Sequence, residues 1–450
     1  ADAKTHNRLA GNMLFINSFK KILIGFLFFI LLFIISISCD STEPPSNQSL
    51  ALKLEDVGCT EAWLQLNTNN IQLPATINLL KNNSVTQTFS LSTKDSLLYI
   101  DSLLPKQNYS FQVSSIPHSG GQNLASSNKV PVTTLGTTSH IFTFQTFSIG
   151  DAGAGSSLLY DVAIINENDI WAVGEIYMND SLGNPDPNAY NAVHWNGQSW
   201  ELKRIKTKAC GGVDYPPIKT IFAFSMNDIL FAHIDGSISY FNGIEFTNDC
   251  SLIIQVNGSA NKMWGISKND FYVVSGNGFI AHYQNGSWTK IESGTTTNVN
   301  DAWGVVENGI STVYSPVSSA FDPPQDKKIL KIRNGVLDSL SWDKDRILYS
   351  CWANNNNYLY VCGSGVYQNK SGQWRQENLP SVSMNMVRGN AINDIFIIGD
   401  FGLAAHFNGS SWQVYNDGFG DIWGLAFKQN LVAFVGQKNG YGAITIGNKN

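Results

Sequence analysis

Charged side chains are scarce in this 450-residue sequence. Asp, Glu, Lys and Arg make up 14% of it, whereas roughly 25% is usual in globular proteins. The formal net charge is −6, and no long basic run is present. Nucleic acid is bound through clustered Lys and Arg side chains, so this composition argues against a nucleic-acid partner. Intrinsic disorder is excluded as well, because aromatic residues reach 12% and disordered chains contain few of them.

Cysteine is also sparse, with six residues in the whole chain. Cys39 follows an apolar segment, and the other five are Cys59, Cys210, Cys250, Cys351 and Cys362. Because five is an odd number, at least one of these thiols stays free. Zinc sites usually carry closely spaced cysteine pairs, and this spacing does not occur. We therefore predict no metal site and no cofactor.

The first 38 residues do not read as part of a folded domain. Lys20 and Lys21 precede an apolar run, Ile22 to Ile37, which is followed by Ser38 and Cys39. A basic segment, an apolar run and a small residue before a cleavage point are typical of a secretory signal. The run is shorter than the roughly 20 residues that a membrane-spanning helix needs.

This segment resembles a bacterial lipoprotein signal, because a cysteine stands directly after the expected cut. The resemblance implies that Cys39 is lipidated and becomes the first residue of the mature protein. It also implies export to the bacterial cell envelope and anchoring in a membrane, with the outer membrane or cell surface as the expected place. Plain secretion and an uncleaved anchor remain alternatives. The polar, proline-containing residues 39–49 are expected to form a tether.

Residues 50–137 contain seven short β-type runs separated by turn residues. In one run Ala62, Leu64 and Leu66 alternate with Trp63 and polar residues, the period of two that marks a strand with one buried face. Seven short strands in fewer than about 100 residues predict an immunoglobulin-like β-sandwich.

This segment resembles a fibronectin type III module. The resemblance is carried by Leu104, Pro105 and Tyr109, which match the Leu-Pro-x-x-x-Tyr turn that places a tyrosine corner in that family. It implies a spacer or docking domain. Trp63 is expected to pack inside the protein rather than to contact a ligand.

From about residue 141 the chain repeats itself. The clearest unit is Asn-Asp-Ile-Trp-Ala-Val-Gly, which starts at Asn168, and similar segments start at Asn227, Asn269 and Asn393. Asn227 and Asn269 are 42 residues apart, a period typical of β-propellers, in which each repeat forms a four-stranded sheet. Most units also hold an Asn-Gly pair between two apolar runs. This pair predicts a hairpin with both turn residues at positive φ.

A third motif, an apolar residue followed by Trp and Gly, precedes the Asn-Asp pair. It reads Met263-Trp264-Gly265 in one unit, and we assign Ile422-Trp423-Gly424 to the same position in the last. Its glycine would permit close packing near a central channel. Seven units can be counted, and the last has three strands. We therefore predict an all-β chain with a seven-bladed β-propeller over residues 141–450, which the segment 141–150 closes as the missing fourth strand.

The repeat region resembles secreted bacterial propellers with Asn-Asp-apolar-aromatic-x-Val-Gly repeats. It is also loosely similar to photosystem II assembly factor-like propellers and to Asp-box propellers. The opening Cys-Asp-Ser-Thr-Glu-Pro-Pro followed by this pair of domains looks like an uncharacterised group of predicted bacterial lipoproteins. These resemblances imply architecture and no particular activity.

Three insertions lengthen loops of the predicted propeller, at residues 177–189, 206–217 and 315–325. The loops that carry the insertions emerge on one face of a propeller, which marks that face as the binding face, although ordinary solvated loops are the alternative. Aromatic side chains could supply flat apolar contacts there, and carboxylates could accept hydrogen bonds. The candidate binding residues are Tyr177, Asp180, Asp186, Tyr190, Tyr215, Phe321 and Asp322.

His194, His282 and His406 share one repeat position and would lie far apart around a ring. We expect them to form structural hydrogen bonds, and we expect the Asp of each Asn-Asp pair to cap a turn. No catalytic residue is predicted. Cys210 and Cys250 fall in consecutive connections between blades and are a candidate disulfide.

These features predict a monomeric, non-enzymatic recognition or scaffold module that binds a protein or a glycan on the loop-bearing face. A carbohydrate-active enzyme, either a glycosidase or a glycosyl-transferring protein, is the first alternative, because an aromatic-rich, weakly charged surface suits sugars. Glycoside hydrolysis needs two carboxylates at a defined separation, and no such pair stands out in the sequence. An assembly or structural protein of the envelope is the other alternative.

Overall fold

The computed structural model describes residues 49–116, 125–207, 210, 214–252, 259–320, 326–340 and 342–450. In these residues the fold is all-β and consists of nine sheets, one with three strands and eight with four. Helical structure is limited to short turns such as η3, Asp400–Gly402. No helix in the described ranges has the length and apolar character that a membrane crossing requires. The expected signal segment and Cys39 lie outside the described residues.

The chain divides into two compact units. The first contains Leu64–Leu98 and Tyr109–Pro131 together with the described residues before Glu55, and the second contains the rest. Strands β1, β2 and β5 form one sheet, and a second sheet has the order β4-β3-β6-β7. The bounds are β1 Ser49–Val57, β2 Ala62–Asn69, β3 Ala75–Lys81, β4 Ser84–Leu91, β5 Asp95–Ile100, β6 Asn108–Ser115 and β7 Val130–Thr133.

Burial along these strands follows the alternation of the sequence. Leu64 and Leu66 of β2 and Phe111 of β6 are fully buried and belong to the core of the first unit. Trp63, in the second unit, is 3% exposed and packs on Tyr99 with the ring centroids 5.6 Å apart. Trp63 is therefore a packing residue, as expected.

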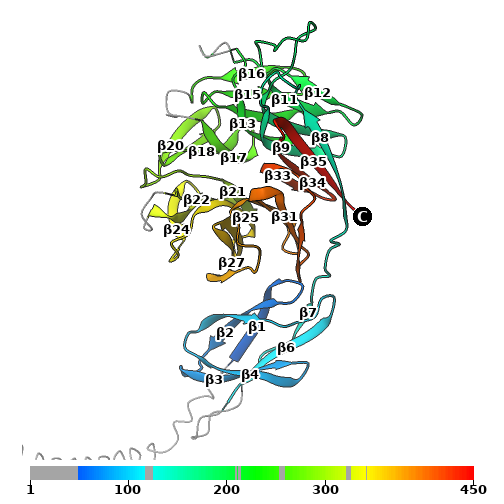
Figure 1. Cartoon of the computed structure of the whole chain (residues 1–450). Helices are drawn as coiled ribbons and strands as arrows, with labels where there is room; N and C mark the ends of the chain where they lie inside the picture. The colour runs from blue at the N-terminus through cyan, green and yellow to red at the C-terminus, as the bar shows by residue number, and fades with distance from the viewer. Residues whose placement is uncertain are drawn as a thin grey trace, which may run out of the picture. The chain divides into compact units, whose positions relative to one another are not determined.

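The second unit consists mainly of four-stranded sheets that follow one another along the chain (Figure 1). Within each sheet consecutive strands are neighbours and run antiparallel. The first three sheets contain β9 Leu158–Asn166, β10 Asp169–Ile176, β11 Tyr190–Trp195 and β12 Trp200–Lys203; β13 Ile218–Ser225, β14 Asp228–His233, β15 Ile238–Phe241 and β16 Phe246–Asp249; and β17 Ala260–Ser267, β18 Asp270–Ser275, β19 Phe279–Gln284 and β20 Ser287–Glu292.

The later sheets keep the same order. They contain β21 Trp303–Glu307, β22 Ile310–Val317, β23 Lys328–Arg333 and β24 Val336–Leu340; β25 Leu348–Asn355, β26 Tyr358–Gly363, β27 Gly365–Lys370 and β28 Gln373–Gln376; β29 Met384–Ala391, β30 Asp394–Gly399, β31 Leu403–Phe407 and β32 Trp412–Tyr415; and β33 Asp421–Lys428, β34 Leu431–Lys438 and β35 Tyr441–Lys449. The outer strand of the last sheet is β8, Phe142–Ile149, which pairs with β35 along its whole length (Figure 1).

The first strand of each sheet is the innermost one. It contacts the first strands of the neighbouring sheets, and β33 contacts β9, which closes the circuit. The glycine of the Trp-Gly motif permits this close approach. The Trp264 ring of the preceding sheet packs against Gly304 so closely that a Cβ added there would lie 2.6 Å from the ring. The second strands are buried along both faces, as in β26 and β30, because a sheet packs on each side of them. The structure therefore confirms a propeller-like all-β fold.

The hairpin turns differ from the prediction in one respect. Asn285 and Gly286 both have positive φ, at 50° and 87°, as expected for an Asn-Gly turn. In the units at Asn196 and Asn408, only the following glycine does. There the asparagine side chain organises the turn, since Asn196 Oδ1 accepts backbone N–H bonds of 2.9 Å from the second and third residues after it. The extra residues of these longer turns explain the difference.

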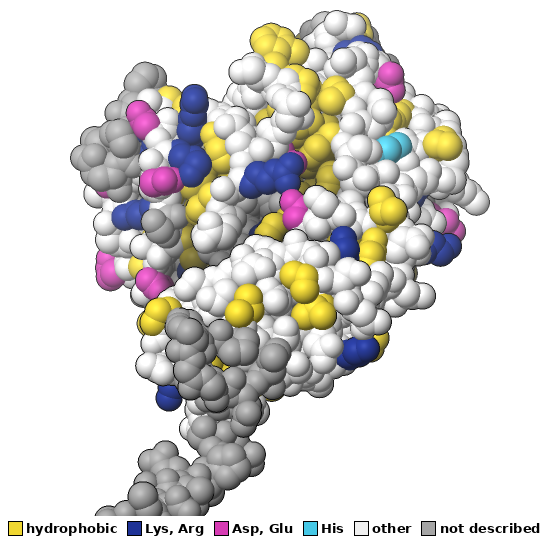
Figure 2. Space-filling model, turned by 90° about the horizontal axis from the view of Figure 1, so that it is seen from below, with side chains coloured by type: hydrophobic (Ala, Val, Ile, Leu, Met, Phe, Trp, Pro, Cys, Tyr) yellow, Lys and Arg dark blue, Asp and Glu magenta, His cyan; other side chains and the backbone are white. Residues whose placement is uncertain are grey.

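The surface reflects the low charge of the sequence. Figure 2 shows a face that is mostly uncharged, on which Lys, Arg, Asp, Glu and hydrophobic side chains are scattered among one another. No broad basic area is visible on that face. This distribution gives no electrostatic footprint for nucleic acid there.

Candidate functional site

The innermost strands of the different sheets pair with their second strands in an equivalent way where they begin. Leu159 of β9 pairs with Gly174, and Leu348 of β25 pairs with Gly363 at the corresponding position. The residue after this position lines one shared cavity of about 520 Å³ in each of the seven sheets. We call these residues the mouth ring: Tyr160, Lys219, Asn261, Asn300, Tyr349, Asn385 and Trp423.

The mouth ring opens on the face that carries the predicted insertions. It lies where the chain enters each innermost strand, so the connections between sheets arrive beside it. Asp400, from the connection between the second and third strands of a sheet, lines the same cavity. These two types of connection contain the insertions at 177–189 and 206–217.

The asparagines of the mouth ring tie neighbouring sheets together. Asn261 Nδ2 donates to the carbonyl of Val299 at 2.9 Å, and Asn300 Nδ2 donates to that of Leu348 at 2.7 Å. Asn385 continues the pattern at 3.0 Å on the following sheet. Each bond runs from one innermost strand to the start of the next, which stabilises the rim of the cavity.

Two buried ion pairs lie immediately behind the ring. Lys262 Nζ contacts Asp161 Oδ1 at 2.7 Å, and Arg388 forms two bonds of 2.9 Å with the carboxylate of Asp301. Both carboxylates are about 2% exposed at the side chain. Burial alone would raise the pKa of Asp301, but the Arg388 guanidinium outweighs it, and the pKa lies below its ordinary value.

These two carboxylates do not favour the enzyme alternative. Asp161 also accepts bonds from the Thr220 hydroxyl at 2.7 Å and the Ile221 amide at 3.0 Å, so its oxygens are occupied. Asp301 is held ionised by Arg388. An inverting or retaining glycosidase needs one protonated carboxylic acid at the scissile bond, and neither of these groups provides it.

Four donors of the mouth ring have no hydrogen-bond or ion-pair partner among the described residues. They are Lys219 Nζ, the hydroxyls of Tyr160 and Tyr349, and Trp423 Nε1. Lys219 Nζ lies 4.3 Å from the centroid of the Tyr160 ring. Burial lowers the pKa of Lys219 below its ordinary value, and burial likewise raises the pKa of Tyr160. The cavity therefore presents donors that a ligand could satisfy.

The structure brings three of the predicted binding residues together around Arg204. The guanidinium lies 3.9 Å from the Tyr190 ring centroid and 5.9 Å from that of Tyr215. It also pairs with Asp186 Oδ2 at 2.5 Å. Asp186 is thus a partner of Arg204, and this cation–π cluster holds both tyrosines at the outer part of the loop-bearing face.

The other described candidates, Tyr177 and Asp180, make different contacts. The Tyr177 hydroxyl donates to Glu175, and this bond raises the pKa of Tyr177 to about 12. Asp180 Oδ1 accepts backbone N–H bonds from Leu182 and Asn184 at 2.8 and 2.9 Å, so it shapes its own loop. Phe321 and Asp322 lie outside the described residues.

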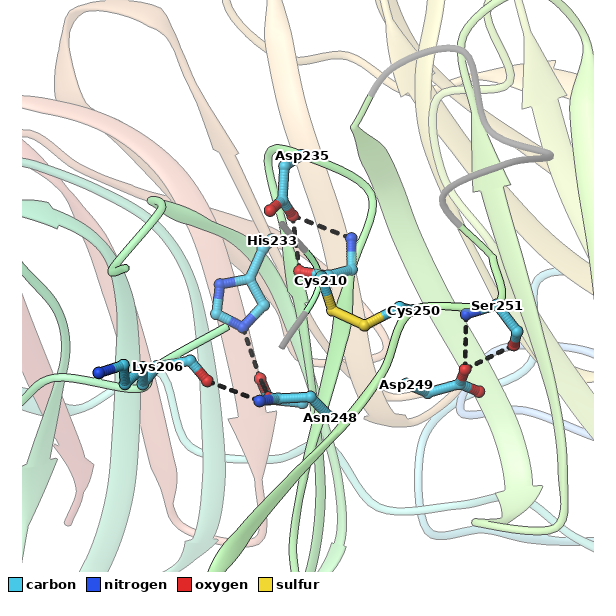
Figure 3. Close-up of a disulfide and its surroundings, with 10 residues drawn as sticks. Lys206, Cys210, His233, Asp235, Asn248, Asp249, Cys250 and Ser251 are labelled. Carbon is cyan, nitrogen blue, oxygen red and sulfur yellow. Dashed lines mark hydrogen bonds between the residues drawn. A yellow bond between two sulfur atoms is a disulfide. The ribbon is translucent and has the colours of Figure 1, made fainter. Parts of the chain in front are cut away.

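Cys210 and Cys250 form a disulfide that links two consecutive connections between sheets (Figure 3). Beside it lies the fully buried His233, whose Nε2 is 2.7 Å from the hydroxyl of Ser239. Asn248 accepts from the same hydroxyl and donates to the Lys206 carbonyl at 2.8 Å (Figure 3). Cys351 and Cys362 are buried free thiols.

The repeat histidines are structural, and their partner corrects one expectation. His194 donates to Asp169 at 2.9 Å, and His282 donates to Asp270 at 2.7 Å. At Asp169, Asp270 and Asp394 the Asp of the Asn-Asp pair therefore bonds across to the third strand of its sheet, where capping of the turn was expected. The turn is capped by the side chain of the residue two positions before the asparagine. In the first sheet Asn166 Oδ1 accepts a hydrogen bond of 2.8 Å from the Asn168 amide.

Sequence reasoning missed the mouth ring and misplaced Trp423. In the structure Ile422 pairs with Gly436 at the start of β33, as Val299 pairs with Val317 in the fourth sheet. Trp423 therefore occupies the position of Asn300, which is three residues before Trp303 of the Trp-Gly motif. Counting back three residues from Trp264, Trp303 and Trp352 reaches Asn261, Asn300 and Tyr349. This offset is the signal in the sequence that leads to the ring.

Comparison with known proteins places the fold. Neither a scan against models of protein families nor a search of curated proteins found a match. A solved structure titled "YCF48 bound to D1 peptide" is similar with a TM-score of 0.51 and 13% identity, covering 70% of this chain and all of the other. The WD40 β-propeller domain of Doa1 has a TM-score of 0.51 and 14% identity, with 68% and 97% covered. At these identities the likeness shows a β-propeller fold and nothing more.

Proposed function

We propose that this chain is a non-enzymatic recognition module that binds a protein partner at the mouth ring. The observation that carries the proposal is the cavity itself, which combines aromatic walls from Tyr160, Tyr349 and Trp423 with donors that have no partner among the described residues. Binding sites of this kind are concave and hold a few convergent polar groups. One similar propeller structure, YCF48, is titled as bound to a peptide, which is consistent with a protein ligand.

The outer part of the same face supports this function. Tyr and Arg are the residue types that dominate the energetics of protein interfaces, and Tyr190, Arg204 and Tyr215 stand together there. A partner that fills the cavity would contact this cluster at the rim. The oxygens of Asp161 are occupied by hydrogen bonds, and Arg388 holds Asp301 ionised, which favours binding over sugar hydrolysis.

We also propose the wider architecture. The closed circuit of innermost strands supports a seven-bladed propeller, and the paired sheets of β1–β7 support a fibronectin type III-like spacer. The signal-like segment before Cys39 supports export and a lipid anchor in the cell envelope. Under this proposal the spacer lies between the lipid anchor and the propeller along the chain.

A binding experiment with a cavity variant tests the function. Soluble protein from residue 40 onward is immobilised and exposed to solubilised envelope proteins, and the retained proteins are identified by cross-linking and mass spectrometry. The variant Tyr349→Ala/Trp423→Ala should lose the retained partner, because it removes two walls of the cavity. The control Ile244→Ser alters a side chain that is 90% exposed, in the turn between β15 and β16, and it should retain the partner.

Three outcomes separate the alternatives. Equal retention by the cavity variant and the control would reject the mouth ring as the site. Retention of polysaccharides in place of proteins, lost in the same variant, would replace the protein ligand by a glycan. Release of new reducing ends from those polysaccharides would favour the carbohydrate-active enzyme.

A further inference from the structure

We propose that the mouth ring recognises a carboxylate group on its partner and that Lys219 is the cation that binds it. This inference rests on the proposed function and adds the chemistry of the ligand. A carboxylate can come from an Asp or Glu side chain or from the end of a polypeptide chain. The chemistry is the same for both sources, and the experiment below tells them apart.

The charges around the cavity leave one cation without a partner. Lys262 is paired with Asp161, and Arg388 is paired with Asp301, at 2.7 and 2.9 Å. Lys219 lines the same cavity and has no carboxylate partner among the described residues. The groups that act on it electrostatically are Asp161, already bound to Lys262, and Lys262 itself. An anion from outside would therefore meet an unpaired positive charge.

The surroundings of Lys219 favour an incoming anion. The ammonium is half-buried against the Tyr160 ring, with 4.3 Å between Nζ and the ring centroid. Partial removal from water costs free energy, which a hydrogen-bonded counter-charge recovers. Burial lowers the pKa of Lys219, and a bound carboxylate would raise it again.

The ring matches a single negative charge better than a double one. A carboxylate offers two oxygens and about four acceptor positions. Lys219 and the hydroxyl of the neighbouring Tyr160 can donate to it. Asp400 lines the same cavity from the connection between β30 and β31 and adds a negative charge to it. Lys219 can neutralise one carboxylate directly, whereas a phosphate dianion would bring a second, unneutralised charge into a cavity that already holds Asp400.

Matched peptide sets test this inference. An array of immobilised octapeptides presents each sequence in three forms: with an internal Glu and an amidated end, with Gln and a free carboxyl end, and with Gln and an amidated end. The native protein should bind one of the first two forms about tenfold more tightly than the third, the effect of a charged hydrogen bond. The first form identifies a side-chain source, and the second identifies a chain end.

The variants assign this preference to Lys219. Lys219→Met should bind all three forms equally, while Lys219→Arg should keep the preference. The control Lys428→Met removes an exposed lysine that lines a different cavity, and the preference should remain. Because Lys219→Met removes a half-buried charge, its folding is checked by thermal unfolding, and we expect the variant to be folded.

The outcomes distinguish this inference from the proposed function. If the native protein binds all three forms equally well, and Tyr349→Ala/Trp423→Ala abolishes that binding, the mouth ring is a binding site but the carboxylate is not its ligand. If Lys219→Met keeps the preference, Lys219 is not the cation. If the cavity variant binds every form as well as the native protein does, the proposed site fails as well.

Discussion

The carboxylate of Asp301 accepts hydrogen bonds from several groups at once. It accepts two bonds from Arg388, one of 2.5 Å from the Ser350 hydroxyl and one of 3.1 Å from the Cys351 amide. Asp301→Asn would leave the buried guanidinium of Arg388 without a counter-charge. Loss of one partner from a buried ion pair costs about 3–5 kcal/mol, so we expect a fall of this size in the free energy of unfolding, measured by urea denaturation followed by tryptophan fluorescence.

A matched substitution on the surface controls this measurement. Asp343 pairs with Lys344 at 2.6 Å, but its side chain is 77% exposed. Asp343→Asn changes the same atoms in water and should leave the unfolding midpoint unchanged. Equal midpoints for Asp301→Asn and Asp343→Asn would show that the buried pair does not stabilise the fold.

His233 predicts a dependence of stability on pH. Burial lowers the pKa of His233 to about 4, whereas about 6.5 is usual in an unfolded chain. Between these values the unfolded chain binds a proton that the native protein does not bind, so acidification favours unfolding. The contribution of His233 is fully present above about pH 6.5 and should fall by about 3 kcal/mol as the pH drops to 4.

Urea denaturation at pH 7.5 and at pH 4.5 measures this effect. His233→Gln keeps a polar side chain but cannot titrate, so the variant should lose less stability between the two pH values than the native protein does. His282→Gln makes the same chemical change at a partly exposed repeat histidine of another sheet and serves as the matched variant. If His233→Gln loses as much free energy of unfolding between pH 7.5 and pH 4.5 as the native protein does, His233 is not the titrating group.

At the scale of the elements, a strand could be predicted where the pattern that marks it is formed by residues close together in the sequence. The Asn-Asp repeats at 168, 227, 269 and 393 lead directly into β10, β14, β18 and β30. Alternation, turn residues and period are properties of neighbouring residues, so one sequence suffices to find them. The all-β propeller fold was predicted for this reason.

The candidate site was harder to predict because it depends on register between distant strands. The seven positions of the mouth ring hold four residue types, so no single repeated residue marks them. Trp423 was misplaced because its Trp-Gly pair imitates the motif three positions further on. Arg204 was overlooked because its contact with Tyr190 and Tyr215 depends on how two loops fold.

The disulfide between Cys210 and Cys250 joins two consecutive connections between sheets covalently. The cysteines are 40 residues apart, and a loop of this length predicts that Cys210→Ser/Cys250→Ser lowers the free energy of unfolding by up to about 4 kcal/mol. A reducing agent should lower the denaturation midpoint of the native protein to that of the double variant. An equal effect of the reducing agent on both proteins would show that the disulfide is not its target.

At the scale of the whole molecule, ring closure and the proposed recognition are connected. β8 comes before the first sheet in sequence but completes the last, with pairs from Phe142–Lys449 to Ile149–Gly442. The closed sheet leaves no unpaired edge on β35, and it fixes the innermost strands that carry Tyr160 and Trp423 on either side of the junction. A rigid circuit of this kind holds the donors of the mouth ring in place before a ligand arrives, which reduces the entropy lost on binding.

The proposed anchor makes a prediction about the location of the whole molecule. If Cys39 is lipidated, the full-length protein produced in a bacterium should sediment with membranes and incorporate an alkyne-tagged fatty acid. Cys39→Ser should abolish the label and move the protein to the soluble fraction, because the thiol that carries the lipid is gone. Ser41→Ala alters a nearby residue, leaves the thiol intact and should behave as the native protein does.

The two other interpretations of the signal segment predict different results. Plain secretion predicts that the native protein and Cys39→Ser are both soluble and unlabelled. An uncleaved anchor predicts that both sediment with membranes and keep the mass of residues 1–38. If the proposed anchor holds the protein in the envelope, tethering would raise the effective concentration at which it meets a partner in the same envelope. A weak mouth-ring interaction, difficult to detect with the soluble protein, would then suffice in the envelope.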